Sequence, residues 1–190
     1  MGTVRLDDVK EHFGDKVRIS WKSFLLKGGD KTPDREKFVN YTQAWKTMAE
    51  LEPRVNFQPW SSEDDPPTGS LSPQIAHKAV LSEWPERAME MHHRLLEAYF
   101  SENRTISEWS VLAELVSSIG EDPNRFLSII EESRELLANE VISEHNEAIN
   151  QGITAVPTVL INSVLPVPGA QESETYINWI ERIIERSENT

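Results

Sequence analysis

The sequence contains no cysteine among its 190 residues. This absence excludes disulfide bonds, thiolate nucleophiles and cysteine ligands to a metal within the chain. Long apolar runs are also missing, because no segment approaches the roughly 20 apolar residues that a membrane-spanning helix needs. Asp7, Asp8 and Glu11 lie where a secretory signal would have its apolar core. We therefore expect no membrane partner and a cytoplasmic location.

Basic residues are scarce relative to acidic ones. Lysine and arginine together number 19 against 32 aspartates and glutamates, which gives a formal charge of -13. Binding to a phosphate backbone needs a surplus of positive charge, so we expect no nucleic-acid partner. The 38% of hydrophobic residues, with six tryptophans and six phenylalanines, argue against disorder. The length suits one domain with its own core, or a small domain that carries an insertion.

Familiar catalytic motifs are absent as well, since the chain has no serine elbow, P-loop or dinucleotide-binding glycine motif. Glu90 and His93 have the Glu-x-x-His spacing that places two metal ligands on one helical face. A di-iron site needs a second such motif and two further carboxylates, and the sequence offers no second copy. We therefore expect no metal site and no cofactor. We assign His12, His77 and His145 to surface or packing positions.

Apolar periodicity divides the chain into an opening with helix and strand patterns, a long helical middle, and an ending that again has strand and helix patterns. In the opening, apolar residues from Val4 to Phe13 predict a helix that ends near Gly14, and alternation over residues 17–24 predicts a half-buried strand. An irregular loop over residues 52–70 interrupts the middle. In the middle, a capping residue followed by proline predicts a helix start at Thr32-Pro33, Ser72-Pro73 and Asp122-Pro123, and Ser107 is a further candidate cap. Trp84-Pro85 predicts a break between two helices. Helices are expected to end near Glu50 and Gly152. We expect two helices between Pro123 and Gly152.

The ending opens at Pro157, at the mouth of the apolar run 158–161. A proline in this position is most often only the start of a strand. The same placement suits a binding loop, because an X-Pro bond adopts the cis form more readily than other peptide bonds and the missing donor leaves the preceding residue free to pair with a ligand. Asn162-Ser163 then predicts a turn into a second, edge strand over residues 164–167, and Tyr176 lies on the apolar face of a closing helix.

Four segments of the chain resemble a known family. They are Trp21–Leu26, His93–Phe100, Gly152–Thr158 and Val167–Gln171. Together they are similar to the DsbA-like thioredoxin domain, especially its cytoplasmic branch of FrnE-like oxidoreductases and 2-hydroxychromene-2-carboxylate isomerases. The resemblance implies an α/β, thioredoxin-like fold interrupted by an all-helical insertion. Residues 1–30 and 151–190 would form the discontinuous thioredoxin-like domain, and residues 31–150 the insertion.

The resemblance also implies a site and an activity. Pro157 would lie in the cis-proline loop of the family, and Val156 would offer its backbone to an extended substrate or to glutathione. Relatives that bind glutathione carry an acidic residue just after the last strand, where this chain has Gln171. Gln171 instead fits the oxidoreductase branch. The implied function is thiol–disulfide oxidoreduction on a protein or small-molecule substrate, with Val156, Pro157 and Gln171 as substrate-binding residues.

The departure from the family lies at the front of the chain. The family begins with a strand that leads to Cys-x-x-Cys, or to a serine in the isomerases, whereas residues 1–6 here resemble the helix beyond that motif. We expect that the first strand is missing and that the sequence is a shortened form of a longer protein. As written, the chain has no catalytic residue and is expected to be inactive. Three alternatives remain open: a glutathione-dependent isomerase or transferase, a non-catalytic peptide-binding module, and a homodimer in which a partner strand fills the sheet.

Overall fold

The computed structural model describes residues 1–26 and 31–188, and the chain forms two compact units. The first unit combines Met1–Lys22 with Glu147–Thr190, and the second is Ser23–Asn146. The first unit contains α1 (Gly2–Phe13), the 3-10 turn η1 (Gly14–Lys16), β1 (Thr158–Ile161), β2 (Leu165–Pro168) and α8 (Ser173–Glu188). The second contains α2 (Arg35–Thr42), α3 (Trp45–Leu51), α4 (Leu71–Glu83), η2 (Pro85–Arg87), α5 (Ala88–Phe100), α6 (Trp109–Ser118) and most of α7 (Pro123–Asn150).

The first unit is built on the hairpin of β1 and β2. The strands are antiparallel, with Thr158 opposite Pro168 and Ile161 opposite Leu165. Asn162 and Ser163 turn the chain with φ values of 51° and 59°, the left-handed conformation that a type I′ turn requires at both central positions, and the Val164 amide donates to the Ile161 carbonyl across them. This hairpin and its turn were predicted from the sequence and are confirmed.

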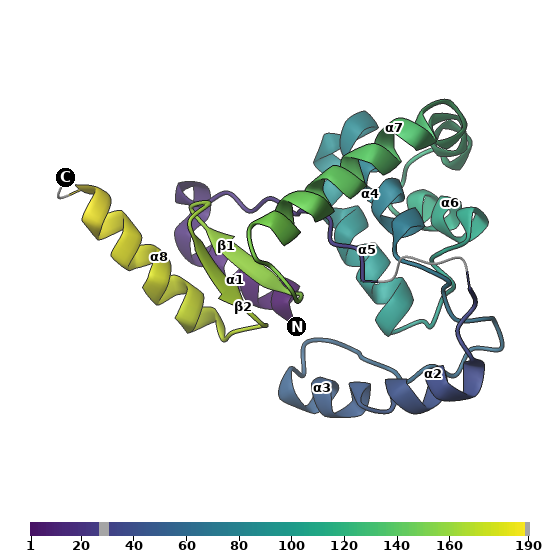
Figure 1. Cartoon of the computed structure of the whole chain (residues 1–190), viewed down its shortest axis with the longest axis horizontal. Coiled ribbons are helices and arrows are strands. Elements are labelled where there is room, and N and C mark those ends of the chain that lie inside the picture. Colours follow the sequence, from purple (N-terminus) through teal and green to yellow (C-terminus); the bar gives the residue numbers. More distant parts are fainter. Residues whose placement is uncertain (27–30, 189–190) are drawn as a thin grey trace. The chain divides into compact units, whose positions relative to one another are not determined.

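Two helices complete the core of the first unit. In Figure 1 they are α1, in purple, and α8, in yellow, with the hairpin in light green. The buried residues that α1, the hairpin and α8 share are Leu6, Val9, Ile161, Val167 and Tyr176. The helix predicted up to Gly14 is confirmed as α1, which ends where Gly14 takes φ 57°. The predicted closing helix is confirmed as α8.

The predicted strand over residues 17–24 is wrong. The side chains do alternate between half-buried and exposed from Val17 to Lys22, as the sequence pattern requires, but the described residues form no ladder there. Farther along the segment, the amide of Ser23 donates to Glu144 Oε2 at 2.8 Å, and that of Leu25 donates to His145 Nδ1 at 3.2 Å. Because a strand is defined by backbone pairing, an alternating pattern without a partner backbone gives only an extended segment.

The core of the second unit lies among α4, α5, α6 and α7. Its fully buried members include Ile75, Met91, Leu112, Leu115, Phe126 and Val141. A separate aromatic group, with edge-to-face contacts, joins α2 and α3 to the end of α5: Phe38, Trp45, Phe57, Trp60, Tyr99 and Phe100. No helix in the described part of the chain is long and apolar enough to cross a membrane.

Several helix boundaries in the second unit differ from the prediction. The single helix expected up to Glu50 is divided into α2 and α3, and its cap is Asp34, whose carboxylate accepts the Lys37 amide at 2.9 Å. Ser107 does not cap α6, because its hydroxyl accepts the Thr68 amide at 3.2 Å instead. The N-cap position of α4 is Ser70 rather than Ser72.

The predicted start at Asp122-Pro123 and the break at Trp84-Pro85 are confirmed. The two helices expected between Pro123 and Gly152 form the single helix α7. Gly152 follows it with φ 79°, the conformation that commonly ends a helix, so the predicted stop is confirmed.

Candidate functional site

The loop that leads into β1 exposes Val156 and Pro157 together. Val156 is 40% exposed, Pro157 is also exposed, and the peptide bond between them is cis. The hydroxyl of Thr158 donates to the carbonyl of Ala155 at 2.7 Å and closes the loop on itself. The loop therefore presents a defined backbone on the surface of the first unit.

The backbone of this loop is only partly paired. The carbonyl of Pro157 accepts the Gly169 amide at 2.8 Å, which continues the ladder beyond the pair of Thr158 and Pro168. Pro157 has no amide hydrogen to donate. Among the described residues, neither the amide nor the carbonyl of Val156 has a hydrogen-bond partner. Val156 is thus an exposed backbone donor and acceptor beside a strand.

The segment after β2 lies against this loop through the bond between Gly169 and Pro157. Gly169 takes φ 78°, and the Gln171 amide is within 3.1 Å of the Gly169 carbonyl. The side-chain amide of Gln171 donates to the Pro168 carbonyl at 2.6 Å. The structure therefore brings the Gln171 segment beside Val156 and Pro157, but one side-chain donor of Gln171 is directed to its own loop.

Two residues that sequence reasoning did not assign to the site hold this segment in place. The hydroxyl of Tyr176, on α8, donates to the Gly169 carbonyl at 2.9 Å and accepts the Gln171 amide at 3.1 Å. Arg5, on α1, donates to the Ala170 carbonyl at 2.7 Å. Sequence reasoning placed Tyr176 only on an apolar helix face; the usable signal was its hydroxyl, which needs a partner when the ring is buried.

Electrostatics at the site are dominated by the buried Arg5. Only 5% of its side chain is exposed, and its second terminal nitrogen lies 2.9 Å from Oε1 of Glu172. Burial raises the pKa of Tyr176, opposed by the hydrogen bond with Gln171 and by the charge of Arg5. The Tyr176 hydroxyl is therefore protonated at neutral pH and acts as a hydrogen-bond donor.

The first residue of α1 lies directly against Pro157. A Cβ atom built on Gly2 would lie 3.3 Å from Pro157 Cγ and 3.5 Å from Pro157 Cβ. Contacts this short require the proline to shift by a few tenths of an ångström. Gly2 therefore allows the start of α1 to approach the loop closely.

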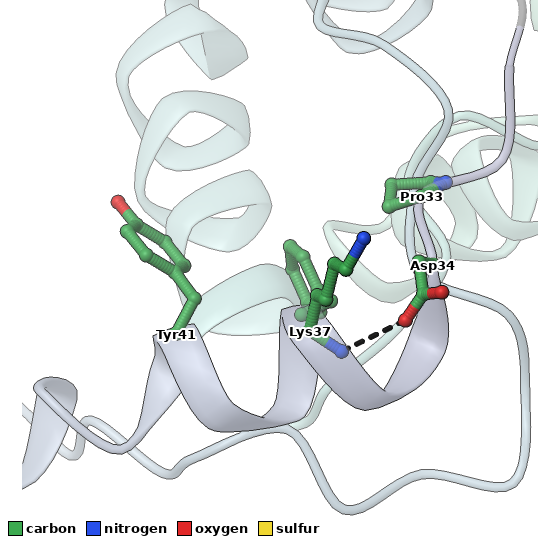
Figure 2. A pocket seen from close by; sticks show the side chains of 5 residues that line it. Pro33, Asp34, Lys37 and Tyr41 are labelled. Carbon is green, nitrogen blue, oxygen red and sulfur yellow. Dashed lines mark hydrogen bonds between the residues drawn. The ribbon is translucent and has the colours of Figure 1, made fainter.

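The second unit has a surface depression of about 290 Å³ at the start of α2. Figure 2 shows its lining from Pro33, Asp34, Lys37 and Tyr41, with Phe38 as the fifth lining residue. The Asp34 carboxylate already caps the helix through the Lys37 amide. The lining is apolar apart from these two charged side chains, and it contains no pair of groups suited to acid–base or nucleophilic chemistry.

The described residues contain no group of three or more histidine or acidic side chains that could hold a metal ion. Glu90, whose spacing to His93 would suit a pair of metal ligands, has its carboxylate 2.9 Å from Arg87 instead. His92 packs between His77 and His93, with ring centroids 5.9 and 6.0 Å away. Burial, with smaller contributions from the neighbouring His77 and His93, lowers the pKa of His92 to about 3. His92 is therefore packed as a neutral ring at neutral pH.

Comparison with protein families gives a match to the DSBA-like thioredoxin domain over residues 1–180. No curated protein matches the sequence. Several solved structures do resemble the chain, among them the following three.

A putative protein disulfide isomerase from Nitrosomonas europaea has a TM-score of 0.80 at 11% identity, covering 97% of this chain and 90% of its own. A probable DsbA oxidoreductase from Streptomyces coelicolor has a TM-score of 0.73 at 18% identity, covering 95% and 82%. The cytosolic disulfide reductase DsbM from Pseudomonas aeruginosa, solved with GSH, has a TM-score of 0.61 at 18% identity, covering 86% and 82%. At these identities the likeness shows a shared fold.

Proposed function

The chain belongs to the DSBA-like thioredoxin domain family, and from this premise we propose that its Pro157 loop binds the substrate of DsbA-like thiol–disulfide chemistry. The substrate is an extended segment that contains cysteine, either in a protein or in glutathione. Val156, Pro157 and Gln171 form the binding surface. The observation that carries the proposal is the unpaired, exposed backbone of Val156 beside β1.

The geometry favours a ligand in extended conformation. A segment lying antiparallel to residues 155–158 would accept a hydrogen bond from the Val156 amide and donate one to its carbonyl. This is strand addition, in which main-chain bonds supply affinity and side-chain contacts supply specificity. The bond from Gly169 to Pro157 keeps the loop aligned with the hairpin on its other side.

Catalysis of thiol–disulfide exchange needs a thiolate to attack the disulfide sulfur. This 190-residue chain contains no cysteine, so it supplies no such nucleophile. We therefore assign binding, and not exchange, to the chain itself. In the reduction of insulin by dithiothreitol, the chain is expected to leave the rate unchanged.

Four further assignments remain proposals. A glutathione-dependent isomerase or transferase is the rival enzyme class, and it is less favoured because Gln171 replaces the acidic residue of glutathione-binding relatives and already donates to Pro168. Turnover of 2-hydroxychromene-2-carboxylate in the presence of glutathione would establish it. The division into residues 1–30 with 151–190 and residues 31–150, the cytoplasmic location and a homodimer likewise remain predictions.

The proposal is tested by an NMR titration of the 15N-labelled chain with reduced glutathione and, separately, with a linear peptide containing one cysteine. The amides of Val156, Gly169 and Gln171 are expected to shift with at least one of these probes. The amide of Val164, 79% exposed in the hairpin turn, serves as an internal control and should not move. N-methylation of the peptide beside its cysteine should weaken binding because it deletes a donor. Unchanged resonances at Val156 with both probes would refute the proposal.

A further inference from the structure

The segment Gly169–Gln171 is held from two helices at three consecutive residues. The Tyr176 hydroxyl of α8 bonds with Gly169 and Gln171, and the Arg5 guanidinium of α1 bonds with Ala170. Both side chains are almost fully buried: Tyr176 is 0% exposed and Arg5 is 4% exposed. These three bonds from buried side chains fix the conformation of a segment that itself lies at the surface.

Tyr176 is central to this arrangement because one hydroxyl serves both ends of the segment. It donates to the Gly169 carbonyl and accepts the Gln171 amide, at 2.9 and 3.1 Å. A phenol has one donor and can accept at the same time, so both bonds form together. The Tyr176 hydroxyl thus joins the first and third residues of a turn in which Gly169 takes the left-handed φ of 78°.

The effect of this hydroxyl reaches Pro157 through one more bond. The Gly169 amide donates to the Pro157 carbonyl at 2.8 Å. Gly169 therefore has its carbonyl fixed by Tyr176 and its amide fixed to Pro157. Rotation of the Gly169 peptide groups would break one of these bonds, so the position of Pro157, and with it the neighbouring Val156, depends on the turn that Tyr176 holds.

We propose that Tyr176 is a positioning residue whose hydroxyl sets the Gly169–Gln171 turn and thereby the orientation in which Val156 and Pro157 meet a ligand. The expected effect of Tyr176 on ligand binding rests on the proposed function, whereas its effect on the loop of the free protein does not. Tyr176 acts through Gly169 and does not itself touch the ligand, because it is fully buried.

The hydroxyl can be separated from the aromatic ring, which packs in the core with Leu6 and Val167. Tyr176→Phe keeps the ring and deletes only the two bonds to the turn. Ser173→Ala is the matched control, since it deletes another α8 hydroxyl, which bonds with Asp8 Oδ2 at 2.5 Å and not with the turn. If Tyr176 acted only through the packing of its ring, the loop amides would have the same resonances in Tyr176→Phe and in Ser173→Ala.

The experiment compares 15N–1H spectra of wild type, Tyr176→Phe and Ser173→Ala, first free and then titrated with reduced glutathione and with the linear cysteine peptide. In Tyr176→Phe the free-state amides of Gly169, Gln171 and Val156 are expected to shift, and the affinity to fall about tenfold, the factor that corresponds to about 1.4 kcal/mol. Ser173→Ala should leave both unchanged. Wild-type positions for these amides in Tyr176→Phe, or an undiminished affinity, would overturn the inference.

Two further outcomes of the experiment also test the inference. If the wild type binds neither probe, the proposed function fails, and the free-state shifts at Val156 alone decide whether Tyr176 positions the loop. If Tyr176→Phe does not fold, the hydroxyl proton of Tyr176 in wild type decides, because a buried phenol that donates to the Gly169 carbonyl exchanges slowly enough to show nuclear Overhauser contacts with the Gly169 and Gln171 amides. Absence of these contacts would overturn the inference, and their presence would support it.

Discussion

The ammonium group of Lys78 lies 2.8 Å from Oε1 of Glu144, although only 4% of the lysine side chain is exposed. A second carboxylate, that of Glu140, is 2.9 Å away. The other oxygen of Glu144 accepts the Ser23 amide at 2.8 Å. One buried charge thus joins α4 to α7 and fixes the end of the extended segment that enters the second unit. Burial alone would lower the pKa of Lys78, but the hydrogen bonds to Glu144 and Glu140 outweigh it, so the net shift is upward.

Replacement of Lys78 should be strongly destabilising. Lys78→Ala leaves Glu144, whose side chain is 10% exposed, without its cation. Removing one partner of a buried pair typically lowers the free energy of unfolding by about 3–5 kcal/mol. Urea denaturation measures this loss, and the control is Lys46→Ala on the exposed face of α3, expected to change stability by less than ~0.5 kcal/mol. Equal effects of the two substitutions would contradict the role assigned to the buried pair.

The buried histidines predict a loss of stability in acid. Burial lowers the pKa of His92 to about 3, with contributions from His77 and His93. Burial and the charge of Lys78 lower the pKa of His77, opposed by a hydrogen bond with the Ala88 backbone and by Glu144. An unfolded histidine protonates near pH ~6.5, so below this pH the unfolded state binds more protons than the folded state, and the free energy of unfolding falls as pH falls.

His92→Gln is expected to reduce this pH dependence. The substitution removes the contribution of His92, which amounts to roughly 1–2 kcal/mol between about pH 6.5 and 5. Denaturation curves at several pH values give the slope directly. The control, His12→Gln, makes the same substitution at a histidine that is 48% exposed in α1 and lies 3.4 Å from Glu181, and it tests whether the loss of slope requires a buried ring. If His92→Gln keeps the full wild-type slope, other groups cause the acid sensitivity.

The hairpin and its flanking helices were predictable because local rules decide them. Asn162-Ser163 between two apolar runs specifies a tight turn, and the stripe containing Tyr176 specifies a helix face. The start of the helix expected over residues 33–50 was not predictable from periodicity, because Asp34 and not Thr32 accepts the Lys37 amide. Cap choice depends on which side chain reaches the free amides, and several candidates stood close together in the sequence.

The structural features that could not be predicted from the sequence depend on contacts between residues far apart in the chain. Residues 17–24 have the alternation of a strand, but the partners of Ser23 and Leu25 are side chains of α7, more than a hundred residues away. Val156 and Pro157 could be proposed as site residues from the local signal of a proline before a strand. Arg5 was missed because nothing near it in the sequence indicates that its guanidinium bonds with Ala170.

The hairpin turn offers a stabilising substitution. The backbone of Ser163 has φ 59°, a left-handed conformation that residues other than glycine, asparagine and aspartate rarely adopt. Glycine at this position relieves the conformational cost and completes the Asn-Gly pair that two-residue turns favour. Ser163→Gly is expected to raise the free energy of unfolding by about 1 kcal/mol, measured by urea denaturation. The opposite substitution, Ser163→Val, should lower it; stabilisation by valine would show that the turn changes conformation.

Arg5 links the stability of the first unit to its binding loop. Its guanidinium lies 2.7 Å from the Ala170 carbonyl and 2.9 Å from Glu172, so Arg5→Met keeps the apolar stem and deletes both bonds. We expect the free energy of unfolding to fall by about 1–3 kcal/mol, because the partly buried Ala170 carbonyl loses its charged donor. Arg18→Met, at an exposed position, is the control. The amides of Ala170 and Gln171 should also shift in Arg5→Met. Lost stability with unmoved loop amides would mean that Arg5 supports the core and not the loop.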